Sequence, residues 1–96
     1  MIEVELKGAL QSNPVETETG RLELRLKGVC VVADQGTELR GFVNSIASLL
    51  DRVRAGDQVE VCGFLRAPGE VQAASLHFRC LRPFVRGYRS TGGYVC

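Results

Sequence analysis

Residues 21–27 read Arg-Leu-Glu-Leu-Arg-Leu-Lys, so a leucine stands at every second position and a charged residue at each position between. A two-residue period of this kind is the pattern of a β-strand that buries one face and exposes the other. The same alternation occurs in residues 2–7, and again in residues 58–66, where Val59, Val61, Gly63 and Leu65 share one face. Half-buried strands need a second layer over their apolar face, and the sequence therefore predicts an all-β fold.

Turn-forming residues divide the first half of the chain into predicted elements. A first strand is expected over residues 2–10, and a polar loop follows it. A second strand starts at Arg21, is interrupted at Gly28 by a bulge or bend, and continues to Val32. The Asp-Gln-Gly turn that follows predicts a hairpin between this strand and a third strand over residues 37–43.

A short helix is expected between the third and fourth strands. Apolar residues recur there at steps of three and four over residues 46–53, and Asn44 or Ser45 can cap the start. A fourth strand over residues 58–66 and a fifth over residues 71–80 complete the predicted domain.

Three strands, a helix and a closing pair of strands make the order of a five-stranded OB-fold barrel. An SH3-like barrel is the alternative, although that fold rarely has a helix at this point. We expect residues 1–80 to form one OB-fold domain, which suits a chain of 96 residues. Residues 81–96 are rich in Arg, Gly and Tyr and have no period, and they are expected to form a flexible basic tail.

The four cysteines, Cys30, Cys62, Cys80 and Cys96, include no CxxC pair, and His77 is the only histidine. Without the paired spacing typical of a zinc site, the sequence predicts no metal, no cofactor, and cysteines that remain reduced thiols. No apolar run is long enough to span a membrane, and the first residues lack the pattern of a secretory signal. These features predict a cytoplasmic protein.

The net charge of +1 conceals an asymmetry along the chain. Residues 1–60 carry seven basic and ten acidic side chains, whereas residues 61–96 carry five arginines and one acid, Glu70. The sum changes from −3 to +4 between the two parts. A nearly neutral protein can attract a polyanion through one basic region of this kind.

Three stretches of the sequence resemble the bacterial single-stranded DNA-binding protein family, including its short members of the primosomal replication protein B type. The first is Val-Glu-Leu-Lys-Gly-Ala-Leu at residues 4–10, with the Asn-Pro and Thr-Gly pairs in the loop that follows. The second is Arg40-Gly41-Phe42. The third is Ala-Gly-Asp-Gln-Val-Glu-Val-Cys-Gly-Phe-Leu-Arg at residues 55–66, and the resemblance as a whole covers residues 2–80.

The resemblance implies an OB fold that binds single-stranded DNA in replication, recombination or repair, that assembles into a homo-dimer or tetramer, and that can contact a replication or repair protein. The chain departs from the family in three ways. It has no tryptophan, a turn of four residues replaces the long excursion between the last two strands, and the acidic C-terminal tip is missing. These departures favour a shortened, specialised relative.

Single strands are bound by combining cations for the phosphates with aromatic faces for the bases. If the leucines of the second strand face the core, Arg21, Arg25 and Lys27 face outward, and the other strands would add further cations and rings. The predicted nucleic-acid-binding residues are Arg21, Arg25, Lys27, Arg40, Phe42, Phe64, Arg66 and Arg79 in the domain, with His77 beside them, and Arg86, Tyr88 and Arg89 in the tail. The alternative for Phe42 and Phe64 is packing against the helix or a neighbouring subunit.

The sequence contains no carboxylate pair, nucleophile motif or glycine-rich phosphate loop, and it therefore predicts no enzymatic activity. With six aromatic residues the stacking surface is thin, so we expect micromolar affinity per domain, with avidity from oligomers. Single-stranded DNA is the expected ligand and RNA the alternative. The rival class is an OB-fold protein-interaction subunit, whose binding would depend little on salt.

Overall fold

The computed structural model describes residues 2–79, and alternating apolar residues make most of this part of the chain extended. The strands are β1 (Glu3–Ala9), β2 (Val15–Glu16), β3 (Leu22–Leu26), β4 (Val29–Ala33), β5 (Glu38–Gly41), β6 (Gln58–Ala67) and β7 (Glu70–Arg79), and the helix is α1 (Ile46–Arg52). The predicted all-β fold with one short helix before the last two long strands is confirmed. The predicted tail, with Arg86, Tyr88 and Arg89, lies outside the described residues.

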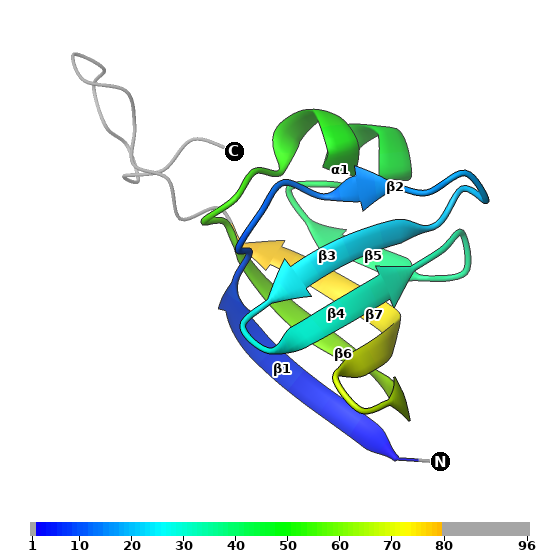
Figure 1. The fold of residues 1–96 in the computed structure, drawn as a ribbon. Helices are drawn as coiled ribbons and strands as arrows, with labels where there is room; N and C mark the ends of the chain where they lie inside the picture. Colours follow the sequence, from blue (N-terminus) through cyan, green and yellow to red (C-terminus); the bar gives the residue numbers. More distant parts are fainter. Residues whose placement is uncertain (1, 80–96) are drawn as a thin grey trace.

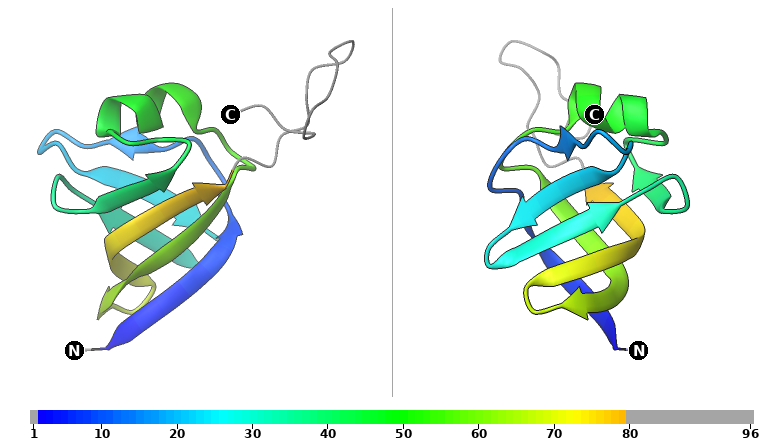
Figure 2. Two further views of the ribbon diagram at one scale, coloured as in Figure 1. Left: turned by 180° about the vertical axis from the view of Figure 1, so that it is seen from behind. Right: turned by 45° about the vertical axis from the view of Figure 1, so that its right-hand side comes forward.

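All of the described strands belong to one sheet, in the order β1-β6-β7-β4-β3-β2, with β5 beside β7. Neighbouring strands are antiparallel, except that β7 runs parallel to both β4 and β5. The sheet curls around a common interior, and α1 lies across one end of it (Figures 1 and 2). The inward face of every long strand can therefore contribute to a single core.

Much of the core consists of residues that the alternation predicted, although Ile2 at the start of the first alternating stretch is exposed. Leu22, Leu24 and Leu26 of β3 are buried, as are Leu76 and Phe78 of β7. Helix α1 adds Leu49 and the residue after its end, Val53, to the same cluster. Ser45 caps the helix by accepting a hydrogen bond from the backbone N–H of Ser48, as one of the two predicted caps.

The predicted second strand is wrong, because residues 22–33 form two strands. The chain turns at Lys27 and Gly28, and β4 returns antiparallel to β3 with Leu26 opposite Val29. The hairpin therefore forms at Gly28 rather than at the Asp-Gln-Gly turn. That turn joins β4 to β5, and both of these strands lie parallel to β7.

The β4–β5 turn is fixed by local polar contacts rather than by strand pairing. The Asp34 carboxylate accepts a hydrogen bond from the backbone N–H of Gly36 at 2.9 Å. The buried Thr37 hydroxyl donates to the carbonyl oxygen of Ala73 at 2.9 Å and accepts from the backbone N–H of Asp34 at 3.1 Å. Thr37 thus ties the turn to β7.

Three further details differ from the prediction. The predicted loop after β1 contains the short strand β2, which pairs with β3. Leu65, expected in the core, is 39% exposed, because a register shift between Leu65 and Ala67 breaks the alternation at the end of β6. The third predicted strand is shorter than expected, since β5 ends at Gly41. No helix within residues 2–79 is long and apolar enough to cross a membrane.

Candidate nucleic-acid interface

Three exposed cations of the predicted site lie in strand β3 or directly beside its ends. Arg21 directly precedes the strand, Arg25 lies within it and Lys27 follows it, and all three are exposed. Within residues 2–79 none of them forms an ion pair. Glu23, half-buried between Arg21 and Arg25, is the acidic residue of the same strand. The outer side of β3 therefore presents three cations that are available to an anionic ligand.

The outer faces of β4, β7 and β6 continue this surface. Arg25 lies opposite Cys30 of β4, and Cys30 lies opposite Glu70 of β7. Burial raises the pKa of the Cys30 thiol, and the nearby Arg25 partly opposes that rise. The surface next to Arg25 is therefore mixed in charge and partly desolvated.

Phe64 and Arg66 of β6 face outward, as predicted, opposite to the buried Val61 and Gly63. Phe64 is half-buried and pairs with Gln72 of β7. Arg66 is exposed, and its Nη1 donates a long hydrogen bond of 3.5 Å to the Gln72 side chain. An aromatic ring and a guanidinium thus lie on the same side of the sheet as Arg25.

Two further predicted cations, His77 and Arg79, lie beside Glu60, an acidic residue that the sequence pattern does not single out. The Glu60 carboxylate accepts a short hydrogen bond from Arg79 Nε and lies 3.7 Å from both Lys7 Nζ and His77 Nδ1. The Arg79 hydrogen bond, assisted by the neighbouring positive charges, lowers the pKa of Glu60. Glu60 therefore largely neutralises the charge of Arg79 within the protein.

Arg40 adjoins this second group but is also paired. It lies opposite His77 in the β5–β7 register, and its Nε is 3.1 Å from the Glu38 carboxylate. Lys7 and Glu60 could not have been found by composition, because they meet only through the β1–β6 register, which sequence alternation does not specify.

The prediction that Phe42 shares the outer face with Arg40 is wrong. Its ring is half-buried against the core, edge-on to Phe78, with 6.3 Å between ring centroids. Arg52 of α1 lies over the ring, 5.2 Å from its centroid, and donates a hydrogen bond to the Phe42 carbonyl oxygen. The reason is Gly41, whose φ of 94° interrupts the extended backbone before Phe42 and so breaks the alternation.

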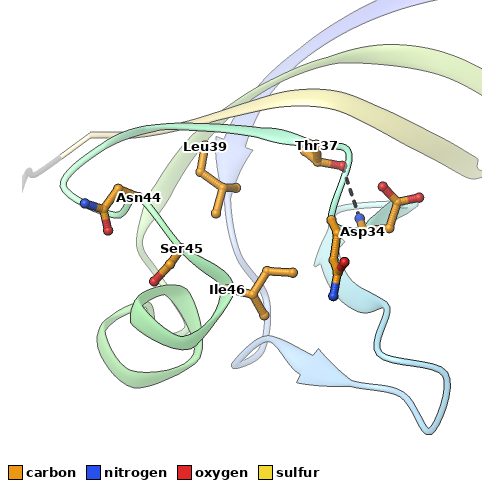
Figure 3. Close-up of a pocket in the computed structure, with 7 residues that line it drawn as sticks. Asp34, Thr37, Leu39, Asn44, Ser45 and Ile46 are labelled. Atoms are coloured by element: carbon orange, nitrogen blue, oxygen red, sulfur yellow. Dashed lines mark hydrogen bonds between the residues drawn. The ribbon is translucent and has the colours of Figure 1, made fainter.

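A pocket of about 310 Å³ opens between the β4–β5 turn, β5 and the segment that leads into α1 (Figure 3). Leu39 and Ile46 point into the hollow, and Asn44 and Asp34 lie at its rim (Figure 3). Within residues 2–79 no three potential metal-ligating side chains come together.

The described part of the predicted site is therefore divided. Arg21, Arg25 and Lys27 share a surface with Phe64 and Arg66, whereas Arg40, His77 and Arg79 gather around acidic residues. Comparison of the chain with models of known protein families, with curated proteins and with solved structures gives no match.

Proposed function

We propose that the protein is a non-catalytic OB-fold domain that binds single-stranded nucleic acid, single-stranded DNA in preference to RNA, in replication, recombination or repair. The observation that carries the proposal is the row of exposed cations along β3, Arg21, Arg25 and Lys27, without ion-pair partners among residues 2–79. The bound strand would lie across the outer face of β3, β4, β7 and β6.

The strand arrangement supports the OB-fold assignment. If β1 with β2 counts as the first strand and β4 with β5 as the third, the sheet contains five strands in the order first, fourth, fifth, third, second. Its two ends approach each other where the backbone N–H of Gln11 donates to the Arg25 carbonyl oxygen at 2.8 Å. OB folds are five-stranded, partly open barrels that bind oligonucleotides on the face of their second and third strands.

The chemistry of this face suits a single strand. The β3 cations would contact phosphates, and such contacts make affinity fall with salt. Phe64 offers part of its ring to a base, and one stacked base contributes about 1–3 kcal/mol. Arg66, beside Phe64, can contact the neighbouring phosphate or stack on the next base.

Fluorescence anisotropy of a labelled oligo-dT tests this proposal. Three phosphate contacts on a single strand give a slope of about −2 for log affinity against log salt, so affinity should fall about 20-fold when salt rises fourfold. Arg25→Ala should reduce that fall to about sevenfold. Arg54→Ala removes an exposed arginine beyond α1 and should leave the slope unchanged. Absence of binding at low salt, or the same slope for both variants, would contradict the proposal.

The alternative function is an OB-fold subunit that docks on a protein. Ile2 and Leu65 favour it, because they are 61% and 39% exposed and adjacent, the Leu65 backbone N–H donating to the Ile2 carbonyl oxygen. Binding through this apolar pair would depend little on salt and would be lost in Leu65→Ser. Oligo-dT binding would be unaffected by that substitution.

We also propose that the protein forms a homo-oligomer through β1. The Leu10 backbone N–H donates to the Asp57 carbonyl oxygen, and the Ile2 carbonyl oxygen accepts from the Leu65 backbone N–H. Backbone hydrogen bonds to β6 are therefore made by the even-numbered residues of this stretch of chain. The backbone groups of Glu5 and Lys7 then point to an edge that no other strand of residues 2–79 pairs with. Exposed edges of this kind pair readily with a second chain.

If a second copy paired antiparallel with β1 across a two-fold axis at Leu6, Glu5 of each copy would lie opposite Lys7 of the other, which makes two ion pairs. Light scattering on Lys7→Glu should show a smaller species than wild type, and the exchange variant Glu5→Lys/Lys7→Glu should restore the assembly. A monomeric wild-type protein would contradict this part of the proposal.

A further inference from the structure

The pocket beside β5 has the size and lining of a site for one small planar group. Its volume of about 310 Å³ is at the lower end of the range for ligand sites, which suits one nucleobase better than a larger molecule. Leu39 and Ile46 form an apolar wall that packs on the core behind it. Figure 3 shows both side chains directed into the hollow from opposite segments.

The polar groups of the lining differ in whether they are already hydrogen-bonded. Thr37 bonds to Ala73 and Asp34, and Ser45 accepts from the Ser48 backbone. By contrast, the exposed amides of Gln35 and Asn44 make no hydrogen bond to any residue of the described range 2–79. Each of these amides offers a donor and an acceptor side by side, the pair that binds the N6 and N7 atoms of adenine.

The charge at the rim discriminates further. The Asp34 carboxylate lies beside the rim, where it accepts hydrogen bonds from the Gly36 backbone N–H and the Gln72 amide, and its negative charge repels phosphate and favours a base that presents an amino group. Adenine has such a group, whereas thymine presents carbonyl oxygens at the corresponding positions. The lining therefore suits an adenine base better than a phosphate or a thymine.

The pocket is continuous with the proposed strand-binding face. Asp34 Oδ2 accepts a hydrogen bond from the Gln72 amide at 3.4 Å, and Gln72 in turn accepts from Arg66 at 3.5 Å. A strand that passes Arg66 and Gln72 thus arrives at the rim of the pocket.

We propose that this pocket takes one unstacked adenine of the bound strand, with Leu39 and Ile46 against its face and the Gln35 or Asn44 amide on its edge. The inference rests on the proposed function and adds a base preference to it. Unstacked bases are read in this manner, by apolar contact and by hydrogen bonds to their edges.

The test compares an all-dT oligonucleotide with the same oligonucleotide carrying one central dA. Wild-type protein should bind the dA strand about tenfold more tightly, since one bidentate amide contact discriminates by roughly that factor or more. The double variant Gln35→Ala/Asn44→Ala should bind both strands with the wild-type affinity for dT. Arg25→Ala, as control, should weaken both strands equally and keep the preference.

Equal affinity of wild type for the two strands, or a preference that survives the double variant, would overturn the pocket assignment. A titration with millimolar adenosine or thymidine, monitored by amide NMR, distinguishes a failure of the pocket assignment from a failure of the proposed strand binding. Shifts at Leu39 and Ile46 with adenosine alone would support the pocket even if no oligonucleotide bound. Absence of such shifts would count against the pocket even if oligo-dT bound well.

Discussion

Replacing Phe42 with alanine separates an interior role for this ring from a role in stacking on bases. The ring lies edge-on to Phe78 at 6.3 Å and beneath the Arg52 guanidinium at 5.2 Å. An aromatic pair of this kind contributes about 0.5–1.5 kcal/mol, and a cation over a ring about 0.5–1 kcal/mol. Removing a fully buried phenylalanine costs about 3–5 kcal/mol. For the half-buried Phe42 we expect a loss of about 2–3 kcal/mol of unfolding free energy.

The assay is urea or thermal unfolding of the full chain, with Phe64→Ala as the matched control. For a domain of this size the loss at Phe42 corresponds to a melting temperature lower by about 10–20 °C. Phe64 lies on the outer face, so its alanine variant should lose less than about 1 kcal/mol of stability, yet bind oligo-dT at least about fivefold more weakly. An unchanged unfolding midpoint for Phe42→Ala, with weakened binding, would refute the interior placement.

Three further predictions follow from the packing and the titrating groups. A Cβ on Gly63 would overlap the carbonyl oxygen of Gln72, so Gly63→Ala should lower the midpoint of thermal unfolding. At Gly20 no atom lies near the added Cβ, so Gly20→Ala should cost only the strain of its positive φ. Equal midpoints for the two variants would contradict this prediction. The pKa of Glu60 is lowered by folding, so its ionised carboxylate stabilises the fold above the unfolded pKa of about 4.5, and this stabilisation is lost as pH falls through the folded pKa. Glu60→Gln should therefore flatten the acid limb of a curve of stability against pH, measured by denaturation. Burial raises the pKa of Cys30, so at mildly alkaline pH a thiol reagent should modify it more slowly than the exposed Cys62, as peptide mass spectrometry can follow.

The elements with a strong period were predictable from the sequence. The leucines of β3, Leu76 and Phe78 of β7, and Leu49 and Val53 of the α1 stripe are buried as expected, because burial of one face fixes which residues point inward. Ile46 and Leu50, the other members of that stripe, are only half-buried. The turn at Gly28 was not predictable, because a glycine between two apolar runs fits a bulge and a hairpin turn equally well. Strand β2 has two residues, too few to show any period.

The site was less predictable, because strand pairing decides which of its charged side chains form ion pairs. Arg79 and Arg25 look alike in the sequence, yet Arg79 meets Glu60 across the sheet while Arg25 forms no ion pair within residues 2–79. Alternation places Phe42 on the wrong face, because it does not hold through Gly41, where the backbone leaves the strand conformation. Sequence alternation gives the face of a residue but not its neighbours on the adjacent strand.

Strand β7 joins the two halves of the sheet, and this has a consequence for how the chain acquires its structure. It pairs with β6 on one side and with β4 and β5 on the other, and it is the last strand of the described chain. During synthesis, β3 and β4 can form a local hairpin, but the other edge of β4 has no partner until residues 70–79 have left the ribosome. Pairings so distant in sequence fold slowly, in milliseconds to seconds. We therefore expect nascent chains that stop before β7 to remain open to proteases and chaperones, and the finished chain to gain protection in a single late step.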